Sequence, residues 1–234
     1  MTLAMFLAVA YLSGGGTHAS AASPSQRTIH KVPPPPDYFP LKKGDWWQYR
    51  STNVSGETTG STMRVVDIEK QPDQSIRYVL EVVGEGPYAQ PIRDWYSKPK
   101  GWVITHKQLY VKTNQEAPFV PEKRYLKNPL RKGETWNWSG TGTAMSVNIS
   151  TENLVAGEEL VDVPAGKFHA MKVITHVTQA GSVLTQNYWY APNVGLVQST
   201  WQGDTTASLA PTVLLDWGPR PDHLVPTSLD RAIK

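Results

Sequence analysis

The sequence predicts an all-β protein: one antiparallel sheet, strongly curved or closed into a barrel, built from two internally duplicated meander halves. Three observations lead to this prediction. Apolar and polar residues alternate with a period of two over short runs, which is typical of strands with one buried face. The 18 Gly and 19 Pro of the 234 residues interrupt these runs at intervals too short for long helices. The two halves of the chain also match each other in order.

The internal match pairs three segments of the first half with three of the second. The run PLKKGDWWQY at 40–49 recurs as PLRKGETWNW at 129–138. One such match can arise by chance, but three in the same order indicate a duplication. The two further pairs, whose spacing increases as hairpin loops of unequal length would cause, are 78–83 with 169–174 and 95–103 with 189–197.

Trp47 and Trp136 hold equivalent positions in this match. Each follows a glycine and an acidic residue, at 44–45 in one copy and 133–134 in the other, which can turn the chain into a strand. Alternate residues of a strand face opposite sides, and each Trp shares its side with the aromatic residue two positions later. We therefore expect both side chains to be buried anchors on the first strand of their halves.

The remaining strands are predicted from the same alternation and from their boundaries at turn-forming residues. Residues 101–106 and 108–113 are expected to form a hairpin with His106 at its turn. The other predicted strands are 61–69, 143–151, 183–190, 194–202 and 211–217.

Four segments are expected along the chain. Residues 1–21 carry no charged side chain, and their apolar run of about ten residues is too short to span a bilayer but fits a signal peptide cleaved near Ala21. Four consecutive prolines indicate an extended, Pro-rich tether. The mature protein is thus expected in the periplasm or outside the cell, without a transmembrane segment. The remaining boundaries are a tether at 22–37, a duplicated β-domain at 38–203 with repeats at about 38–113 and 127–203, and a C-terminal tail at 204–234.

Composition and motifs argue against most kinds of catalysis. The chain has no Cys, which excludes thiolate metal sites and a cysteine nucleophile. It also lacks a Gly-x-Ser-x-Gly elbow, a His-Glu-x-x-His motif, a phosphate-binding loop and a dinucleotide fingerprint. A net charge of +3 does not indicate a nucleic-acid partner. We therefore expect no enzyme activity, no metal and no cofactor.

Three motifs resemble those of a group of uncharacterised bacterial secreted proteins and lipoproteins. They are YFPLKKGDWWQY at 38–49, VPAGKFHAMKV at 163–173 and YWYAPNVGLV at 188–197. The resemblance spans residues 38–202 and implies an exported β-protein of the cell envelope, with no biochemical role to transfer. The long bent sheet of this group is more distantly similar to the half-barrels of periplasmic lipoprotein carriers, which hold acyl chains in a concave face.

Aromatic residues on both faces of the predicted strands need a cover on the second face. The segment 91–132 has a net charge of +7, so some of these rings lie near ammonium groups in sequence. Rings rimmed by cations suit an amphiphile with an anionic head. Three roles remain open: a packed structural protein, a carrier of lipid or lipoprotein acyl chains, and a glycan-binding module. The predicted ligand-binding residues are Trp95, Trp102, Trp189, Lys98, Lys100 and Lys107.

Overall fold

The computed structural model describes residues 33–53, 55–86, 89–142, 147–202 and 208–219. These residues form twelve strands, and they include no helix long and apolar enough to cross a membrane. The strands are β1 (Asp45–Thr52), β2 (Thr58–Lys70), β3 (Ile76–Gly84), β4 (Ile92–Ser97), β5 (Gly101–Tyr110), β6 (Gln115–Asn128), β7 (Thr135–Thr141), β8 (Asn148–Val163), β9 (Gly166–Gln179), β10 (Ser182–Ala191), β11 (Gly195–Gln202) and β12 (Ser208–Pro219).

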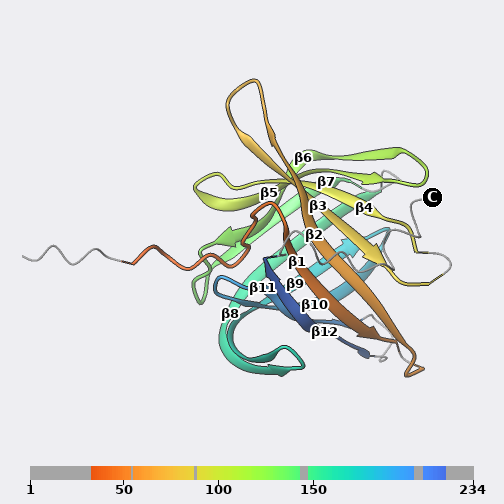
Figure 1. Cartoon of the computed structure of the whole chain (residues 1–234), viewed down its shortest axis with the longest axis vertical. Helices are drawn as coiled ribbons and strands as arrows, with labels where there is room; N and C mark the ends of the chain where they lie inside the picture. Colours follow the sequence, from red (N-terminus) through yellow and green to blue (C-terminus); the bar gives the residue numbers. More distant parts are fainter. Residues whose placement is uncertain (1–32, 54, 87–88, 143–146, 203–207, 220–234) are drawn as a thin grey trace, which may run out of the picture. The chain divides into compact units, whose positions relative to one another are not determined.

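The strands form a closed antiparallel barrel (Figure 1). Each strand pairs with its neighbours in the chain, and the first strand pairs with the last through register pairs from Asp45↔Pro219 to Ser51↔Thr212. The predicted all-β fold is therefore confirmed, and of the two predicted forms of the sheet the closed barrel is the one observed.

The matched sequence segments fall on strands that are six apart in the barrel: on β1 and β7, on β3 and β9, and on β4–β5 and β10–β11. The turns before β1 and β7 also make equivalent backbone hydrogen bonds. Gly44 N donates to Val65 O on β2 at 3.0 Å, and Gly133 N donates to Val155 O on β8 at 2.8 Å. Both glycines have a positive φ, 92° and 83°, which favours Gly over other residues. Two six-stranded halves would produce this pattern, and the duplication itself stays a prediction.

Trp47 and Trp136 are both buried, with 4% and 6% of their surface exposed, as predicted. The Trp47 indole N–H donates a hydrogen bond to Val194 O at 2.6 Å and so ties β1 to the turn between β10 and β11. The Trp136 N–H is buried without a partner among the described residues. Its ring instead packs edge-on against Trp102, with centroids 6.2 Å apart.

The hairpin predicted at 101–113 is wrong. β5 runs unbroken to Tyr110 and pairs with β6. The pairing register shifts between Thr105 and Lys107, so His106 forms a bulge in a continuous strand. His106 therefore lies within a strand and not at a turn. The sequence pattern does not indicate β6, because Pro118 and Pro121 interrupt it and prolines usually argue against a strand.

The domain boundary expected at residue 203 falls inside the barrel. β12 lies between β1 and β11, so residues assigned to the tail supply the closing strand, which confirms the strand predicted at 211–217. The predicted signal peptide at 1–21, the tether as far as residue 32 and the tail beyond residue 219 lie outside the described residues.

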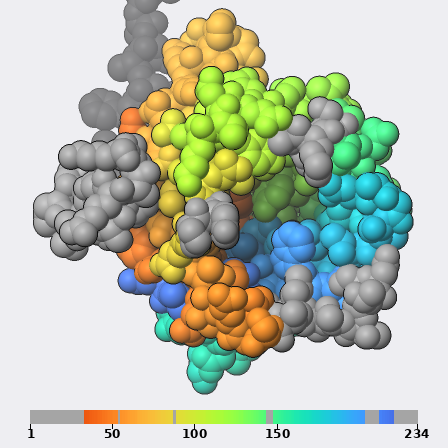
Figure 2. All heavy atoms as spheres, turned by 90° about the vertical axis from the view of Figure 1, so that its right-hand side faces the viewer, coloured from red at the N-terminus to blue at the C-terminus, as the bar shows by residue number. Residues whose placement is uncertain are grey.

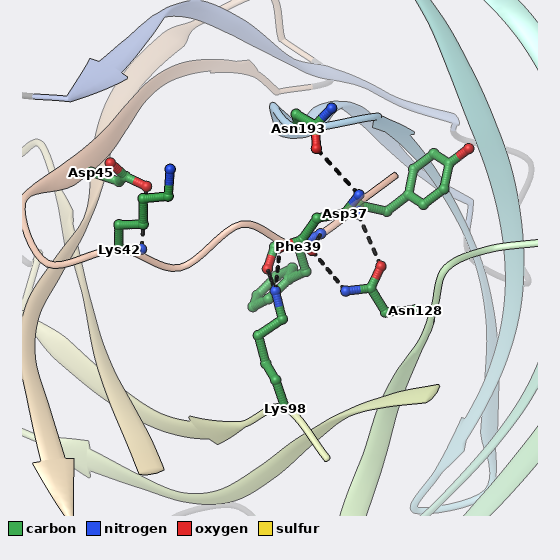
Figure 3. A network of polar contacts seen from close by, with 8 residues as sticks. Asp37, Phe39, Lys42, Asp45, Lys98, Asn128 and Asn193 are labelled. Atoms are coloured by element: carbon green, nitrogen blue, oxygen red, sulfur yellow. Dashed lines mark hydrogen bonds and ion pairs between the residues drawn. The ribbon is translucent and has the colours of Figure 1, made fainter. Parts of the chain in front are cut away.

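The residues just before β1 close one end of the barrel (Figure 3). Tyr38, Phe39 and Leu41 belong to the buried core cluster. The Phe39 ring packs against the rings of Tyr96 and Tyr125, with centroid separations of 5.1 and 5.5 Å. Residues 37–41, called the plug below, therefore bring aromatic surface to this end of the barrel.

Asp37 fastens the plug to three separate regions of the barrel (Figure 3). Its carboxylate accepts hydrogen bonds from Lys98 Nζ at 2.5 Å and Asn128 Nδ2 at 2.7 Å, and its backbone N–H donates to Asn193 Oδ1 at 3.3 Å. Burial by itself would raise the pKa of Asp37. The hydrogen bonds from Lys98 and Asn128 and the charge of Lys98 outweigh burial, so the pKa is lowered.

Replacing Asp37 by Ala is expected to lower the free energy of unfolding by about 1–2 kcal/mol. The reason is the loss of three hydrogen bonds to a partly exposed carboxylate, from Lys98, Asn128 and the backbone N–H of Phe39. Thermal unfolding should show this as a fall in Tm of roughly 2–8 °C. Asp67→Ala is the matched control, because its ion pair with Lys43 at 2.8 Å is more exposed. Equal Tm values for the two variants would contradict an anchoring role for Asp37.

One ladder of the barrel is much shorter than the rest. Among the described residues, β6 and β7 share one register pair, Val120↔Thr141, whereas every other ladder has four or more. Trp138 Nε1–H donates to Pro121 O at 3.0 Å across this junction. A pocket of 530 Å³ lies there, and we call the junction the β6–β7 seam. The pocket is lined by Pro121, Glu122, Arg124, Asn137, Trp138 and Ser139.

Candidate functional site

Most buried polar side chains of the barrel face its interior. The strand register shows this for Asp94, which is paired with core residue Leu80 on one side and Gln108 on the other. Because alternate residues share a face, the same reasoning applies on the other strands. We call this interior set the polar belt. It consists of half-buried Lys123, the register partner of Thr105, and of the buried residues Asp94, Thr105, Thr151, Asn153, Thr175, Gln186 and Ser199.

The polar belt lies between the apolar core and the end of the barrel opposite the plug. On β4, Tyr96 is nearer the plug than Asp94, and on β10, Tyr190 is nearer the plug than Gln186. The face seen in Figure 2 is hollowed between the yellow to green atoms of β5 and β6 and the cyan to blue atoms of β9 and β10. A ligand that enters from this face therefore meets the polar belt before the apolar core.

One side of the polar belt is held in place by its own hydrogen bonds. Thr175 Oγ1 donates to Asn153 Oδ1 at 2.9 Å, and Asn153 Nδ2 donates to Trp136 O at 3.0 Å. Gln186 is the register partner of Thr175, and its side-chain oxygen accepts a hydrogen bond from the Tyr188 hydroxyl. These side chains are therefore pre-organised, which reduces the entropy that a bound ligand must overcome.

Buried tyrosine hydroxyls adjoin the polar belt. The hydroxyls of Tyr125 and Tyr190 are 3.3 Å apart. Burial raises the pKa of Tyr96, Tyr125, Tyr188 and Tyr190, so each hydroxyl keeps its proton at neutral pH. These groups can both donate and accept hydrogen bonds.

Asp94 is the one carboxylate among the residues of the polar belt. It is 8% exposed, and burial raises its pKa to about 6, although a hydrogen bond from Gln108 and the charge of Lys123 oppose the rise. Its Oδ1 has no hydrogen-bond partner among the described residues. A buried carboxylate with a free oxygen can accept a hydrogen bond from a ligand.

Lys123 is half-buried and surrounded by rings. Its ammonium lies 5.5 Å from the ring centroid of Trp138, 5.7 Å from that of Phe119 and 5.9 Å from that of Tyr125. Burial lowers the pKa of Lys123, and the charge of Asp94 opposes this. The two charges influence each other without closing an ion pair, so both can still take a ligand group. No three His, Asp or Glu residues in the described ranges lie close enough together to hold a metal ion.

The predicted ligand-binding rings Trp95 and Trp189 are covered by side chains of the chain itself. The Lys107 ammonium lies 4.6 Å from the Trp95 ring centroid, and Glu69 accepts the Trp95 indole N–H at 3.0 Å. Trp95 and Trp189 are 8% and 7% exposed, so little of either ring is free for a ligand. Trp189 has the same arrangement. The Lys172 ammonium lies 4.9 Å from its ring centroid, and its indole N–H donates to Glu159 Oε2 at 2.7 Å.

The other three predicted residues are divided among different surroundings. Lys98 holds the plug through Asp37. Trp102 is half-buried, with the Arg124 guanidinium 5.3 Å from its ring centroid. Lys100 is exposed between β4 and β5. Of the six predicted residues, the structure brings Lys107 and Trp95 into contact. Trp189 lies apart from them on β10, which pairs with β9 and β11. The role of the six residues in ligand binding stays a prediction.

Sequence reasoning missed the polar belt. A signal was present, because Asp94 shares its strand face with Tyr96, and Gln186 shares its face with Tyr188 and Tyr190. A polar residue within an aromatic face is typical of a buried polar layer. The pattern alone did not reveal that this face lies inside a closed barrel.

No family model and no curated protein matches the sequence. Two solved structures resemble the fold. One is a presumed exported protein from Bacteroides fragilis with a YmcC-like fold, with a TM-score of 0.50 and 16% identity over 78% of this chain and 99% of that one. The chain shares this fold. The other is a presumed lipoprotein from Parabacteroides distasonis, with a TM-score of 0.50 and 15% identity over 80% of this chain and 100% of that one.

Proposed function

We propose that the protein is an exported binding protein of the bacterial cell envelope, and that it holds a small polar ligand inside the barrel without converting it. The polar belt carries this proposal. Buried polar groups are costly unless they are hydrogen-bonded, and Asp94 keeps an oxygen that no described residue satisfies. A ligand that supplies hydrogen bonds to this layer removes some of that cost.

The charged members of the polar belt indicate which groups such a ligand carries. Asp94 can accept a hydrogen bond and Lys123 can donate one. A ligand that carries both a hydrogen-bond donor and an acceptor complements the two side chains. Hydroxyl-bearing small molecules have this combination.

This ligand chemistry bears on the roles that the sequence left open. An acyl-chain carrier requires an apolar cavity, whereas the interior on the hollow side of the core is lined by Asn, Gln, Ser and Thr side chains. The polar belt therefore favours a glycan or another polar molecule over a fatty chain. The support comes from interior residues and not from the outer rings singled out in the sequence.

The location in the envelope is supported by two observations. Residues 1–21 have the uncharged, apolar pattern of a signal peptide. The two structures of similar fold are described as an exported protein and a lipoprotein.

Native mass spectrometry of protein incubated with a small-molecule extract of bacterial cells tests the binding role. The wild type is expected to retain discrete species below about 1 kDa. Gln186→Leu should retain at least tenfold less, because it replaces a belt amide by an apolar group that leaves a buried partner unsatisfied.

The matched control is Asn187→Leu, which makes the same kind of change one residue along β10. Its side chain bonds Thr200 at 3.2 Å and faces away from the interior. This variant should retain ligand like the wild type. A wild-type protein that retains nothing, or equal losses in both variants, would overturn the proposed function.

A further inference from the structure

A second cluster of reactive side chains lies outside the polar belt, on four neighbouring strands. His106, at the bulge in β5, contacts Ser97 on β4 through Nε2···Oγ at 2.8 Å. Its other ring nitrogen, Nδ1, lies 2.5 Å from Glu122 Oε1 on β6. Arg77 on β3 approaches the same glutamate oxygen at 3.8 Å.

The direction of these hydrogen bonds follows from the donors and acceptors available. An ionised carboxylate only accepts, so His106 Nδ1 must carry the proton that Glu122 receives. A neutral imidazole then has its lone pair on Nε2, and the Ser97 hydroxyl donates to it. The serine proton thus points at a base that is oriented by a carboxylate, which is the arrangement that activates a serine nucleophile.

Burial suits this assignment. The imidazole of His106 is 10% exposed, so its orientation is held by packing as well as by its two hydrogen bonds. Ser97 is half-buried at the end of β4 and remains reachable from solvent. Arg77 directly precedes Tyr78, whose register partner Tyr96 directly precedes Ser97. Its guanidinium lies 3.8 Å from Glu122 Oε1, so it adds a cation to the cluster. A cation beside a nucleophile can stabilise the negative charge of a tetrahedral intermediate.

We propose that Ser97 is a nucleophile that attacks small acyl esters, with His106 as its general base and Glu122 as the positioning residue. This activity goes beyond the proposed function, which assigns no chemistry to the protein. Ser97 Oγ forms a bond to the ester carbonyl carbon while its proton passes to His106 Nε2. That proton leaves with the alcohol as the ester bond breaks, and water then hydrolyses the acyl-serine.

A biotinylated fluorophosphonate tests the proposal without knowledge of a natural substrate. Its reaction forms a bond between Ser97 Oγ and phosphorus and releases fluoride, while the serine proton passes to His106. We expect peptide mass spectrometry to locate the label on Ser97. Ser97→Ala should abolish labelling, and His106→Gln should slow it at least 10²-fold, as removal of a general base does. Arg77→Met should slow it about tenfold.

Ser51→Ala is the control, because Ser51 is also half-buried and hydrogen-bonded, to Thr212 at 2.8 Å, but has no histidine beside it. It should leave labelling unchanged. Circular dichroism of each variant separates loss of reactivity from loss of fold. Absence of label on Ser97 in the folded wild type, or labelling of folded His106→Gln at the wild-type rate, would overturn this proposal and leave the binding role standing.

Discussion

Trp47→Ala and Trp136→Ala are each expected to lower the free energy of unfolding by about 3–5 kcal/mol, because each removes a large buried ring and leaves a cavity in the core. Denaturant unfolding followed by circular dichroism measures this as a lower midpoint at an unchanged m-value. Trp217→Ala is the control, since 39% of Trp217 is exposed, and it should cost far less. Variants of Trp47 and Trp136 that unfold like the wild type would disprove their role as anchors.

The two anchors should differ when only the indole N–H is removed. Trp47→Phe leaves Val194 O without its 2.6 Å hydrogen bond, which costs about 1–3 kcal/mol beyond the lost volume. Trp136→Phe loses no hydrogen bond to a described residue, because that N–H has no partner there. We therefore expect Trp47→Phe to be the more destabilising of the pair.

Asp94→Asn is expected to raise the free energy of unfolding at pH 7 by about 2 kcal/mol. The pKa of Asp94 is raised to about 6 by burial, against a usual value near 4, and each unit corresponds to about 1.4 kcal/mol. The ionised carboxylate is therefore a cost that the folded state carries at neutral pH. The pKa of about 6 already includes the favourable charge of Lys123. The amide that replaces the carboxyl group is itself polar and buried, which keeps the net effect below the full amount.

The pH dependence provides the decisive signature for Asp94. Between pH 4 and 6 the folded protein holds a proton on Asp94 that the unfolded chain has released. The contribution of this group to stability therefore falls as pH rises through that window and is constant above it. The difference between Asp94→Asn and the wild type should grow from near zero at pH 4 to its full size at pH 7. A difference that does not change with pH would contradict the raised pKa.

Asp67→Asn is the control for this experiment, because hydrogen bonding and the charge of Lys43 lower the pKa of that exposed carboxylate. Its stability difference should have the opposite sign. A carboxylate kept in the interior at a cost to stability is typical of a functional position. Stabilisation by Asp94→Asn together with loss of ligand would therefore support the binding role from a second direction.

Alternation along single strands was enough to predict the all-β fold and the burial of Trp47 and Trp136. Such patterns report local geometry: which residues share a face and where the chain turns. β6 was hidden because Pro118 and Pro121 break its pattern, although β5 supplies it with a partner. β12 was partly hidden because its sequence resembles a tail until its pairing with β1 is known.

The candidate sites depend on pairing that no local pattern contains. Asp94 and Lys123 interact because β4 and β6 both flank β5 in a closed barrel. Ser97, His106 and Glu122 meet because a bulge shifts the register of β5 at His106. Strict alternation from Gly101 does not place the bulge, so the sequence could not show that the three side chains come together.

The β6–β7 seam also bears on how the barrel yields under load. A closed barrel can widen only if one of its strand-to-strand ladders separates. The work needed to open it is therefore set by the weakest ladder. In the part of the chain that the structure describes, this ladder has one register pair, Val120↔Thr141, while the contact between the first and last strands has seven. By the pairs of described residues, the contact between the first and last strands is the stronger of the two. A force from within is therefore expected to separate β6 from β7, which are neighbours in sequence. The site where the barrel is expected to open is thus the β6–β7 seam, and not the place where its first and last strands meet.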